Sequence, residues 1–256
     1  MTITNDQFQT YERQGYIIVE DLIPSTELAE LSAMTHRLLD GGLKPEMAYD
    51  GKIPAEFYTF WEPGLEDREE IPRRDRIRLM SRMAFHHPYF WKFACHPNIY
   101  AVISALLDDG VQLFGESIFR KPAHHGIDAA PHQDMAFWPG LEPRSLKCWL
   151  AIDPAAVENG CMYFIPASHR KALPHEQHPV QKWILSDEQW DLDRQVPIEL
   201  SPGSAVFFDS GLIHRSHPNR SDFSRRSWAA NYVAEHVEYL EPWTSEYGFK
   251  LIPPTG

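Results

Sequence analysis

Short strand-like segments separated by turn residues fill the second half of the sequence and constrain its fold most strongly. Between residues 111 and 236, runs of β-branched and aromatic residues alternate with Gly, Pro, Asn and Asp, which favours strands joined by turns. The runs are VQLFGESIFRKP, RSLKCWLAID, GCMYFIPAS, GSAVFFDSGLIH and RRSWAANYVAE. Five or more such strands predict a β-sandwich or barrel of antiparallel strands.

The first 110 residues are predicted to be mainly helical. Capping residues open the helix TNDQFQTYERQG, Gly15 ends it, and the strand YIIVEDLI follows. Pro24 and Ser25 begin a second helix, which continues through ELAELSAMTHRLLDGG, and a further helix is predicted over YFWKFACHPNIYAVISALL. Because no repeat or linker divides the chain, we expect one domain over residues 1–256, with these helices packed outside the sheet.

Residues 43–78 are rich in proline and charge, and the sequence predicts irregular structure there. The segment EFYTFWEPG, residues 56–64, contains four aromatic side chains. Two interpretations remain open for it. It forms either a lid over a site or an aromatic loop packed on the domain.

Composition limits the partners of the chain. Its net charge of −12 argues against nucleic acid and anionic membranes, which need a basic surface. No apolar run approaches the roughly 20 residues that span a bilayer, and the N-terminus lacks a secretory pattern. Three scattered cysteines do not form a disulfide framework. We therefore expect a cytoplasmic protein with a small-molecule partner, and the sequence predicts no particular oligomeric state.

The segment PHQDMAFWPG places His132 and Asp134 two residues apart. On an extended segment, both side chains leave the same face and can converge on one metal ion, with Gln133 pointing elsewhere. His214, at the end of the strand GSAVFFDSGLIH, supplies a third ligand. Its neighbour His217 would lie on the opposite face, so His214 is preferred. Two histidines and one carboxylate are typical of non-haem Fe(II) oxygenases, whereas zinc favours other ligand sets.

Two adjacent arginines begin the strand after His214. Arg225 and Arg226 must face opposite sides of a strand, so one can enter a pocket while the other meets solvent. A guanidinium in the pocket would bind a dicarboxylic acid through two hydrogen bonds. The alternative is a pair of surface arginines.

These motifs, in this order, resemble the phytanoyl-CoA dioxygenase family of Fe(II)- and 2-oxoglutarate-dependent oxygenases. The resemblance is carried by GYIIVEDLIP, FRKP, HQD, CWLAID, ENGCMYFIPASHR and GSAVFFDSGLIHRSHPNRS, and so spans nearly the whole chain. It implies a double-stranded β-helix, or jelly roll, over residues 111–236. It also implies that Fe(II) is the metal and that 2-oxoglutarate and O2 are co-substrates.

The resemblance also implies roles for individual residues. His132, Asp134 and His214 would bind the iron, and Arg225, eleven residues after His214, would bind the far carboxylate of 2-oxoglutarate. Positions near the co-substrate match Gln133, Trp149 and Ser216, although a core tryptophan and a strand-end hydroxyl remain alternatives. Asn219 and Ser221 are interpreted as turn residues, and His169 as a structural or near-surface residue.

The implied reaction is hydroxylation of an aliphatic C–H bond with release of succinate and CO2. Halogenating relatives lack the carboxylate ligand, so Asp134 favours hydroxylation or a related oxidation. The expected substrate is an amino-acid derivative, an organic acid or a secondary metabolite, and candidate substrate contacts are Phe119, Arg120, Phe137 and Trp138. An acyl-CoA hydroxylase, a jelly-roll isomerase or hydrolase, and a binding protein without catalysis are the alternatives.

Overall fold

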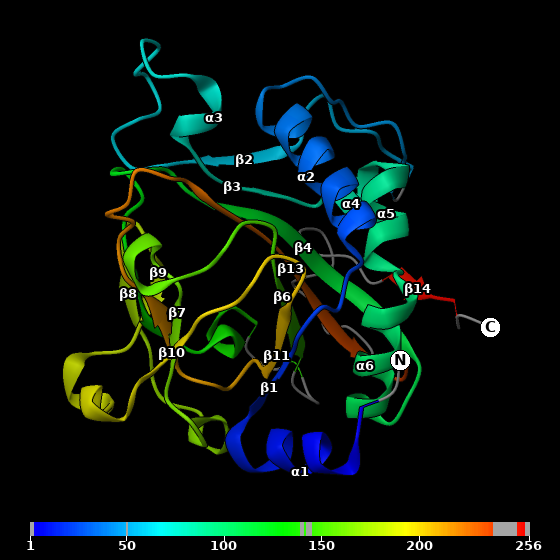
Figure 1. The fold of residues 1–256 in the computed structure, drawn as a ribbon, viewed down its shortest axis with the longest axis vertical. Coiled ribbons are helices and arrows are strands. Elements are labelled where there is room, and N and C mark those ends of the chain that lie inside the picture. Colours follow the sequence, from blue (N-terminus) through cyan, green and yellow to red (C-terminus); the bar gives the residue numbers. More distant parts are fainter. Residues whose placement is uncertain (1–2, 50, 139–140, 142–144, 238–249, 254–256) are drawn as a thin grey trace.

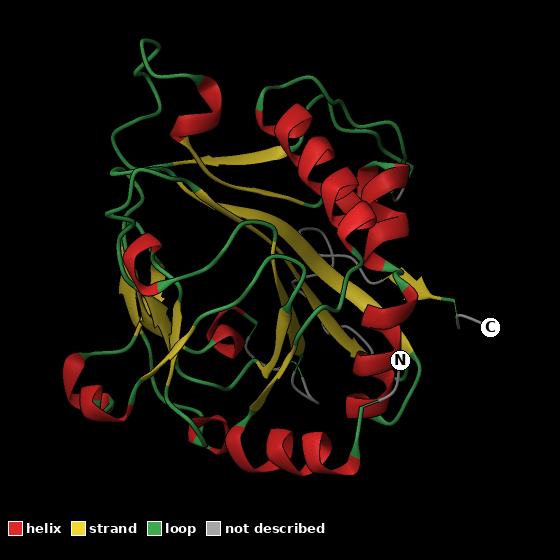
Figure 2. Cartoon of the chain, viewed as in Figure 1, coloured by secondary structure: helices red, strands yellow, loops and turns green. Residues whose placement is uncertain are grey.

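A computed structural model describes residues 3–49, 51–138, 141, 145–237 and 250–253. Two antiparallel sheets face each other, and helices cover the outside of the larger one (Figures 1 and 2). This arrangement is the predicted jelly roll, with helices of the N-terminal part outside the sheets. The helices are α1 (Asn5–Gln14), α2 (Ser25–Leu39), α3 (Arg73–Arg76), α4 (Met83–His86), α5 (Pro88–Ala94) and α6 (Pro97–Leu107).

The larger sheet has eight strands in the order β1-β11-β6-β13-β4-β3-β2, with β14 also pairing with β4. Its members are β1 (Tyr16–Val19), β2 (Tyr58–Trp61), β3 (Ile77–Ser81), β4 (Val111–Lys121), β6 (Leu146–Ala151), β11 (Ala205–Asp209), β13 (Arg225–Ala234) and β14 (Lys250–Ile252).

The smaller sheet has four strands in the order β10-β7-β12-β5. Its members are β5 (Ala129–His132), β7 (Met162–Phe164), β10 (Val196–Ile198) and β12 (His214–Ser216). A separate hairpin, β8 (Glu176–His178) with β9 (Lys182–Ile184), lies beside this sheet (Figure 1).

Alternation along the central strands divides the core into two layers. On β6, Cys148 and Leu150 join the cluster under the helices, whereas Trp149 joins the cluster between the sheets. On β13, Trp228 packs under the helices and Ala229 between the sheets. Because side chains alternate across a strand, every second residue of these strands faces the space between the sheets. The candidate site lies in that space.

The N-terminal part contains more strand than expected. β1 pairs with β11 at one edge of the larger sheet, and β3 pairs with β4 toward the other edge. Residues 43–78, predicted as irregular, include β2, α3 and the start of β3. The 56–64 segment is therefore neither a free lid nor a packed loop along its whole length. Its middle forms an edge strand in which Tyr58 and Phe60 remain 49% and 45% exposed.

Local signals explain the helix ends. Thr4 caps α1 through a reciprocal capping box with Gln7, and Gly15 ends α1 in the left-handed conformation at φ +83°. The single helix predicted over residues 89–107 is instead two helices, α5 and α6. Pro97 disfavours a helical conformation at His96, which has ψ 131° and caps α6 by accepting a hydrogen bond from the Asn98 N–H.

Candidate metal and co-substrate site

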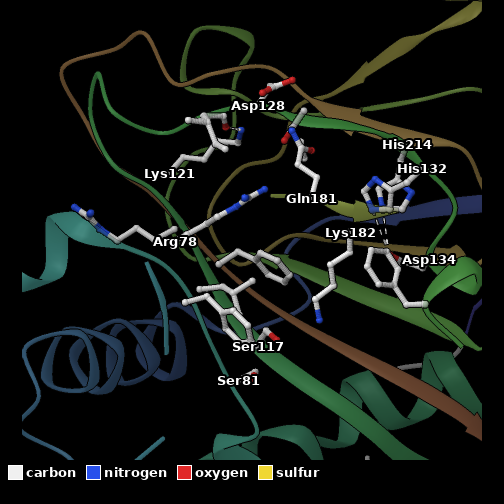
Figure 3. A pocket seen from close by; sticks show the side chains of 18 of the residues that line it. Arg78, Ser81, Ser117, Lys121, Asp128, His132, Asp134, Gln181, Lys182 and His214 are labelled. Carbon is white, nitrogen blue, oxygen red and sulfur yellow. Dashed lines mark hydrogen bonds and ion pairs between the residues drawn. The ribbon is translucent and has the colours of Figure 1, made fainter. Parts of the chain in front are cut away.

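The two histidines of the predicted metal site are direct partners in the smaller sheet. His132 ends β5, His214 begins β12, and the register pairs them across the two strands. Their ring centroids lie 4.2 Å apart. Asp134 follows at the start of a 3₁₀ turn, after Gln133 in an extended conformation with φ −111° and ψ 130°. One ligand atom from each of the three residues lies within 4.8 Å of the others (Figure 3).

Backbone carbonyls fix the orientation of both imidazoles. His132 Nδ1 lies 2.8 Å from the Ala130 carbonyl oxygen, and His214 Nδ1 lies 2.9 Å from that of Leu212. Each Nδ1 must donate to its carbonyl, so each Nε2 keeps a free lone pair. Both Nε2 atoms face Asp134 Oδ1, at 3.5 and 3.7 Å.

Burial and neighbouring charges set the protonation of His214 and Asp134. It lowers the pKa of His214 to about 3, with help from the neighbouring His132, so this imidazole is neutral at physiological pH. Burial alone would raise the pKa of Asp134. The Lys147 ammonium and the two imidazoles outweigh this effect and hold that pKa well below its usual range. A neutral imidazole and an ionised carboxylate are the forms that bind a metal.

The donor set fits Fe(II). It offers imidazole nitrogens and one carboxylate oxygen on one side, and it opens onto a cavity of about 600 Å³. The cavity lies between the two sheets and is closed in part by the β8–β9 hairpin and by β2. In Figure 3, His132, Asp134 and His214 lie at one side of this cavity, while Lys121 and Arg78 lie at the other. Among the described residues, no other His, Cys, Asp and Glu group of this kind is present.

Arg225 borders the same cavity as a buried cation. Its side chain begins β13 and is 4% exposed, and its guanidinium carbon lies 5.1 Å from the Trp149 ring centroid. Nε and Nη1 have no hydrogen-bond partner among the described residues. Burial lowers the pKa of Arg225 to about 10, so the group stays charged at neutral pH. A buried guanidinium with unused donors fits the carboxylate of a small dianion.

Arg226 faces the opposite side of the sheet, as the alternation predicts, but it does not reach solvent. Its guanidinium forms an ion pair with Asp153, with Nη2 at 2.6 Å from Oδ1, and donates a hydrogen bond to the Ser32 hydroxyl. Ser32 belongs to α2 and Asp153 follows β6. Arg226 therefore connects a covering helix to the sheet.

The other predicted co-substrate residues are placed differently from one another. Trp149 and Ser216 are buried and border the cavity. Gln133 is fully buried but does not border it. Its amide donates to the Lys171 and Gly211 carbonyls and accepts from the Leu173 N–H, so its hydrogen bonds are used to join surrounding loops.

The predicted substrate contacts all border the cavity. The Phe137 ring centroid lies 5.8 Å from that of His132, and Trp138 packs edge-on against Phe114. Phe119 lies on β4 and packs partly buried against the inter-sheet cluster. Arg120 forms an ion pair with Asp75, so its charge is already matched by the protein.

Turn residues before β13 take the positions expected of them. The Asn219 amide donates to the carbonyls of Lys121 and Phe223, and its Oδ1 accepts from the Ser221 N–H and hydroxyl. His217 stacks edge-on against Tyr163 rather than joining the metal cluster, and buried His169 also lies outside that cluster.

Two buried lysines of the site were not predicted. Lys121 ends β4 beside Arg225 and donates to the carbonyls of Ile127 and His217. Burial, reinforced by Arg225, lowers its pKa to about 7. Lys147 lies on β6, 2.5 Å from Asp134 Oδ2. The sequence carried a signal for it, because a lysine two residues before Trp149 must share the inward face of that strand.

A family model described as "Phytanoyl-CoA dioxygenase (PhyH)" matches residues 11–227. The chain belongs to this family. The rat protein "Phytanoyl-CoA dioxygenase domain-containing protein 1" (Rattus norvegicus) is 30% identical over 94% of this chain and 96% of its own length. Family membership makes the protein an oxygenase-type enzyme that depends on iron and 2-oxoglutarate.

Solved structures share the fold. EctD from S. alaskensis with bound Fe has a TM-score of 0.73 at 22% identity, covering 94% of this chain and 82% of EctD. The epimerase SnoN from nogalamycin biosynthesis, in complex with Fe3+, alpha ketoglutarate and nogalamycin RO, has a TM-score of 0.67 at 22% identity, covering 91% and 84% of the two chains. The EctD structure holds iron, and the SnoN structure holds iron and alpha ketoglutarate. Among the described residues, no helix is long and apolar enough to cross a membrane.

Proposed function

We propose that the protein hydroxylates an aliphatic C–H bond of a small organic molecule, using Fe(II), 2-oxoglutarate and O2. The observation that carries this proposal is the His132–Asp134–His214 cluster in one cavity with the buried Arg225. A metal-binding jelly roll that catalyses isomerisation or hydrolysis has no use for a buried guanidinium whose Nε and Nη1 have no hydrogen-bond partner among the described residues.

His132, Asp134 and His214 would hold the iron through Nε2, Oδ1 and Nε2, leaving its cavity side open. Arg225 would bind the far carboxylate of 2-oxoglutarate and orient it along Trp149. When bound, the iron and 2-oxoglutarate supply the oxidising chemistry, with one oxygen atom of O2 entering the product and the other entering succinate as CO2 leaves.

The cavity supports a small substrate. Its volume of about 600 Å³ lies within the usual range for small-molecule sites, and it must also hold 2-oxoglutarate. Phe119, Phe137 and Trp138 offer apolar contacts for a carbon skeleton. An amino-acid derivative, an organic acid or a secondary metabolite fits this space better than a whole acyl-CoA.

The test is succinate release by the Fe(II)-loaded protein against a panel of small organic acids, amino-acid derivatives and one acyl-CoA. We expect one panel member to stimulate succinate release and to gain a single oxygen atom by mass spectrometry. His214→Ala is the matched control and should release no succinate. Product that forms without 2-oxoglutarate, or that is rearranged without gaining oxygen, would contradict the proposed hydroxylation.

A further inference from the structure

A buried lysine contacts the carboxylate of the metal cluster. Lys147 lies on β6, on the face that looks between the sheets, and its side chain is 10% exposed. Its Nζ is 2.5 Å from Asp134 Oδ2, an ion-pair distance without hydrogen-bond geometry, and 5.7 Å from the Phe208 ring centroid. No other carboxylate of the described residues pairs with this ammonium. A buried ammonium is costly unless it is paired, so the position of Lys147 depends on Asp134.

The two oxygens of Asp134 have separate partners. Oδ1 faces His132 Nε2 and His214 Nε2, whereas Oδ2 faces Lys147. With Oδ2 held by the lysine, a metal between the imidazoles would meet Oδ1 alone. A carboxylate that binds through one oxygen would leave more of the metal's coordination positions open than one that binds through both oxygens.

Lys147 also changes the charge of the ligand set. As metal ligands, two imidazoles and one carboxylate carry −1, and the ammonium beside the carboxylate brings the four side chains to zero. The lysine competes with a metal cation for Asp134, so it must weaken metal binding. It must also strengthen binding of a dianion to the metal, because less protein charge opposes that dianion.

We propose that Lys147 is a positioning residue that keeps Asp134 a single-oxygen ligand and cancels its charge, exchanging metal affinity for 2-oxoglutarate affinity. This inference rests on the proposed function, since it concerns the same iron site. It predicts opposite changes in two affinities when the charge is removed. A lysine with only a packing role would change both in the same direction or neither.

The experiment measures two dissociation constants anaerobically in wild type and in Lys147→Met. Fe(II) affinity is measured by competition with a chelator, and 2-oxoglutarate affinity by titration of the Fe(II)-loaded protein. Because groups that contact a metal ligand shift metal affinity by roughly 10–100-fold, we expect Fe(II) to bind roughly tenfold more tightly. We expect 2-oxoglutarate to bind more weakly by a similar factor. Lys147→Arg, which keeps the charge, should return both constants toward wild type.

Lys182 provides a matched control for loss of a cation from the same cavity. It borders the cavity from the β8–β9 hairpin and makes no ion pair with a described residue. Lys182→Met should therefore leave Fe(II) affinity unchanged. Circular dichroism and thermal unfolding check that each variant folds, and Lys147→Gln replaces Lys147→Met if the latter does not fold.

The outcomes separate this inference from the proposed function. Wild-type protein that binds neither Fe(II) nor 2-oxoglutarate would overturn both. Wild-type protein that binds both, together with a Lys147→Met variant in which both affinities fall or neither changes, would overturn the inference alone. Failure of both neutral variants to fold would assign Lys147 a structural role and also overturn it.

Discussion

The adjacent arginines at the start of β13 give a prediction with its own internal control. Arg225 faces the cavity with Nε and Nη1 unpartnered among the described residues, whereas Arg226 is paired with Asp153 and Ser32 on the other face. We therefore expect Arg225→Met to impair co-substrate binding with little effect on stability. Arg226→Met should do the reverse.

The expected loss of affinity follows from the hydrogen bonds that Arg225 can form. A hydrogen bond to a charged group contributes about 1.5–3 kcal/mol, and a guanidinium binds a carboxylate through two. A loss of roughly 3–4 kcal/mol corresponds to a 2-oxoglutarate affinity lower by a factor on the order of 10²–10³.

Stability should respond in the opposite way. Arg225→Met removes a buried cation together with its cation–π contact with the Trp149 ring, which is worth about 1–2 kcal/mol. Relief of the cost of burying that charge offsets this loss. Arg226→Met leaves the Asp153 carboxylate without its partner, and we expect the free energy of unfolding to fall by about 3 kcal/mol.

Calorimetric titration of 2-oxoglutarate into the Fe(II)-loaded protein measures the affinity, and urea unfolding of the metal-free protein measures stability. Unchanged 2-oxoglutarate affinity in Arg225→Met would refute the assignment of this arginine. Loss of that affinity in a stable Arg226→Met variant would show that the two faces of β13 have been assigned the wrong way round.

Two further predictions concern other buried charges. His132→Ala should abolish succinate formation with the fold retained. Asp134→Ala should abolish it too and should also destabilise the metal-free protein by about 3 kcal/mol, because it leaves the Lys147 ammonium unpaired. Equal free energies of unfolding of the two variants in urea would contradict this difference. Burial raises the pKa of Glu116 from 4.5 to about 8 in the folded protein. Its contribution to stability is therefore complete below pH 4.5 and is lost as pH rises to about 8, because the unfolded chain releases the proton first. Glu116→Gln should flatten this part of the stability–pH curve, and an unchanged slope would show that another group is responsible.

Much of the site could be predicted because its residues belong to regular, alternating segments. His132 and Asp134 are close in sequence, and parity alone shows that Arg225 and Arg226 face apart. The pairing of His132 with His214 is different. It depends on the register between β5 and β12, which one sequence does not reveal.

The strand β2 and the contacts of Gln133 could not be predicted from the sequence for a shared physical reason. β2 lies at a sheet edge and alternates between exposed and half-buried positions, but the aromatic residues Tyr58 and Phe60 take the exposed positions, so the sequence does not resemble a half-buried strand. The family resemblance implies that Gln133 lies near the co-substrate. Its amide donates to the Lys171 and Gly211 carbonyls, which only the fold brings to it. Contacts between residues distant in sequence decide such roles.

The measurement that tests the iron site most directly is the visible spectrum of the protein under anaerobic conditions with Fe(II) and 2-oxoglutarate. A co-substrate chelating an iron held by His132, Asp134 and His214 should give a weak charge-transfer band. The band should require both additions and should be absent from His214→Ala. Wild-type protein that is folded and shows no band would contradict the iron and 2-oxoglutarate site described for this chain.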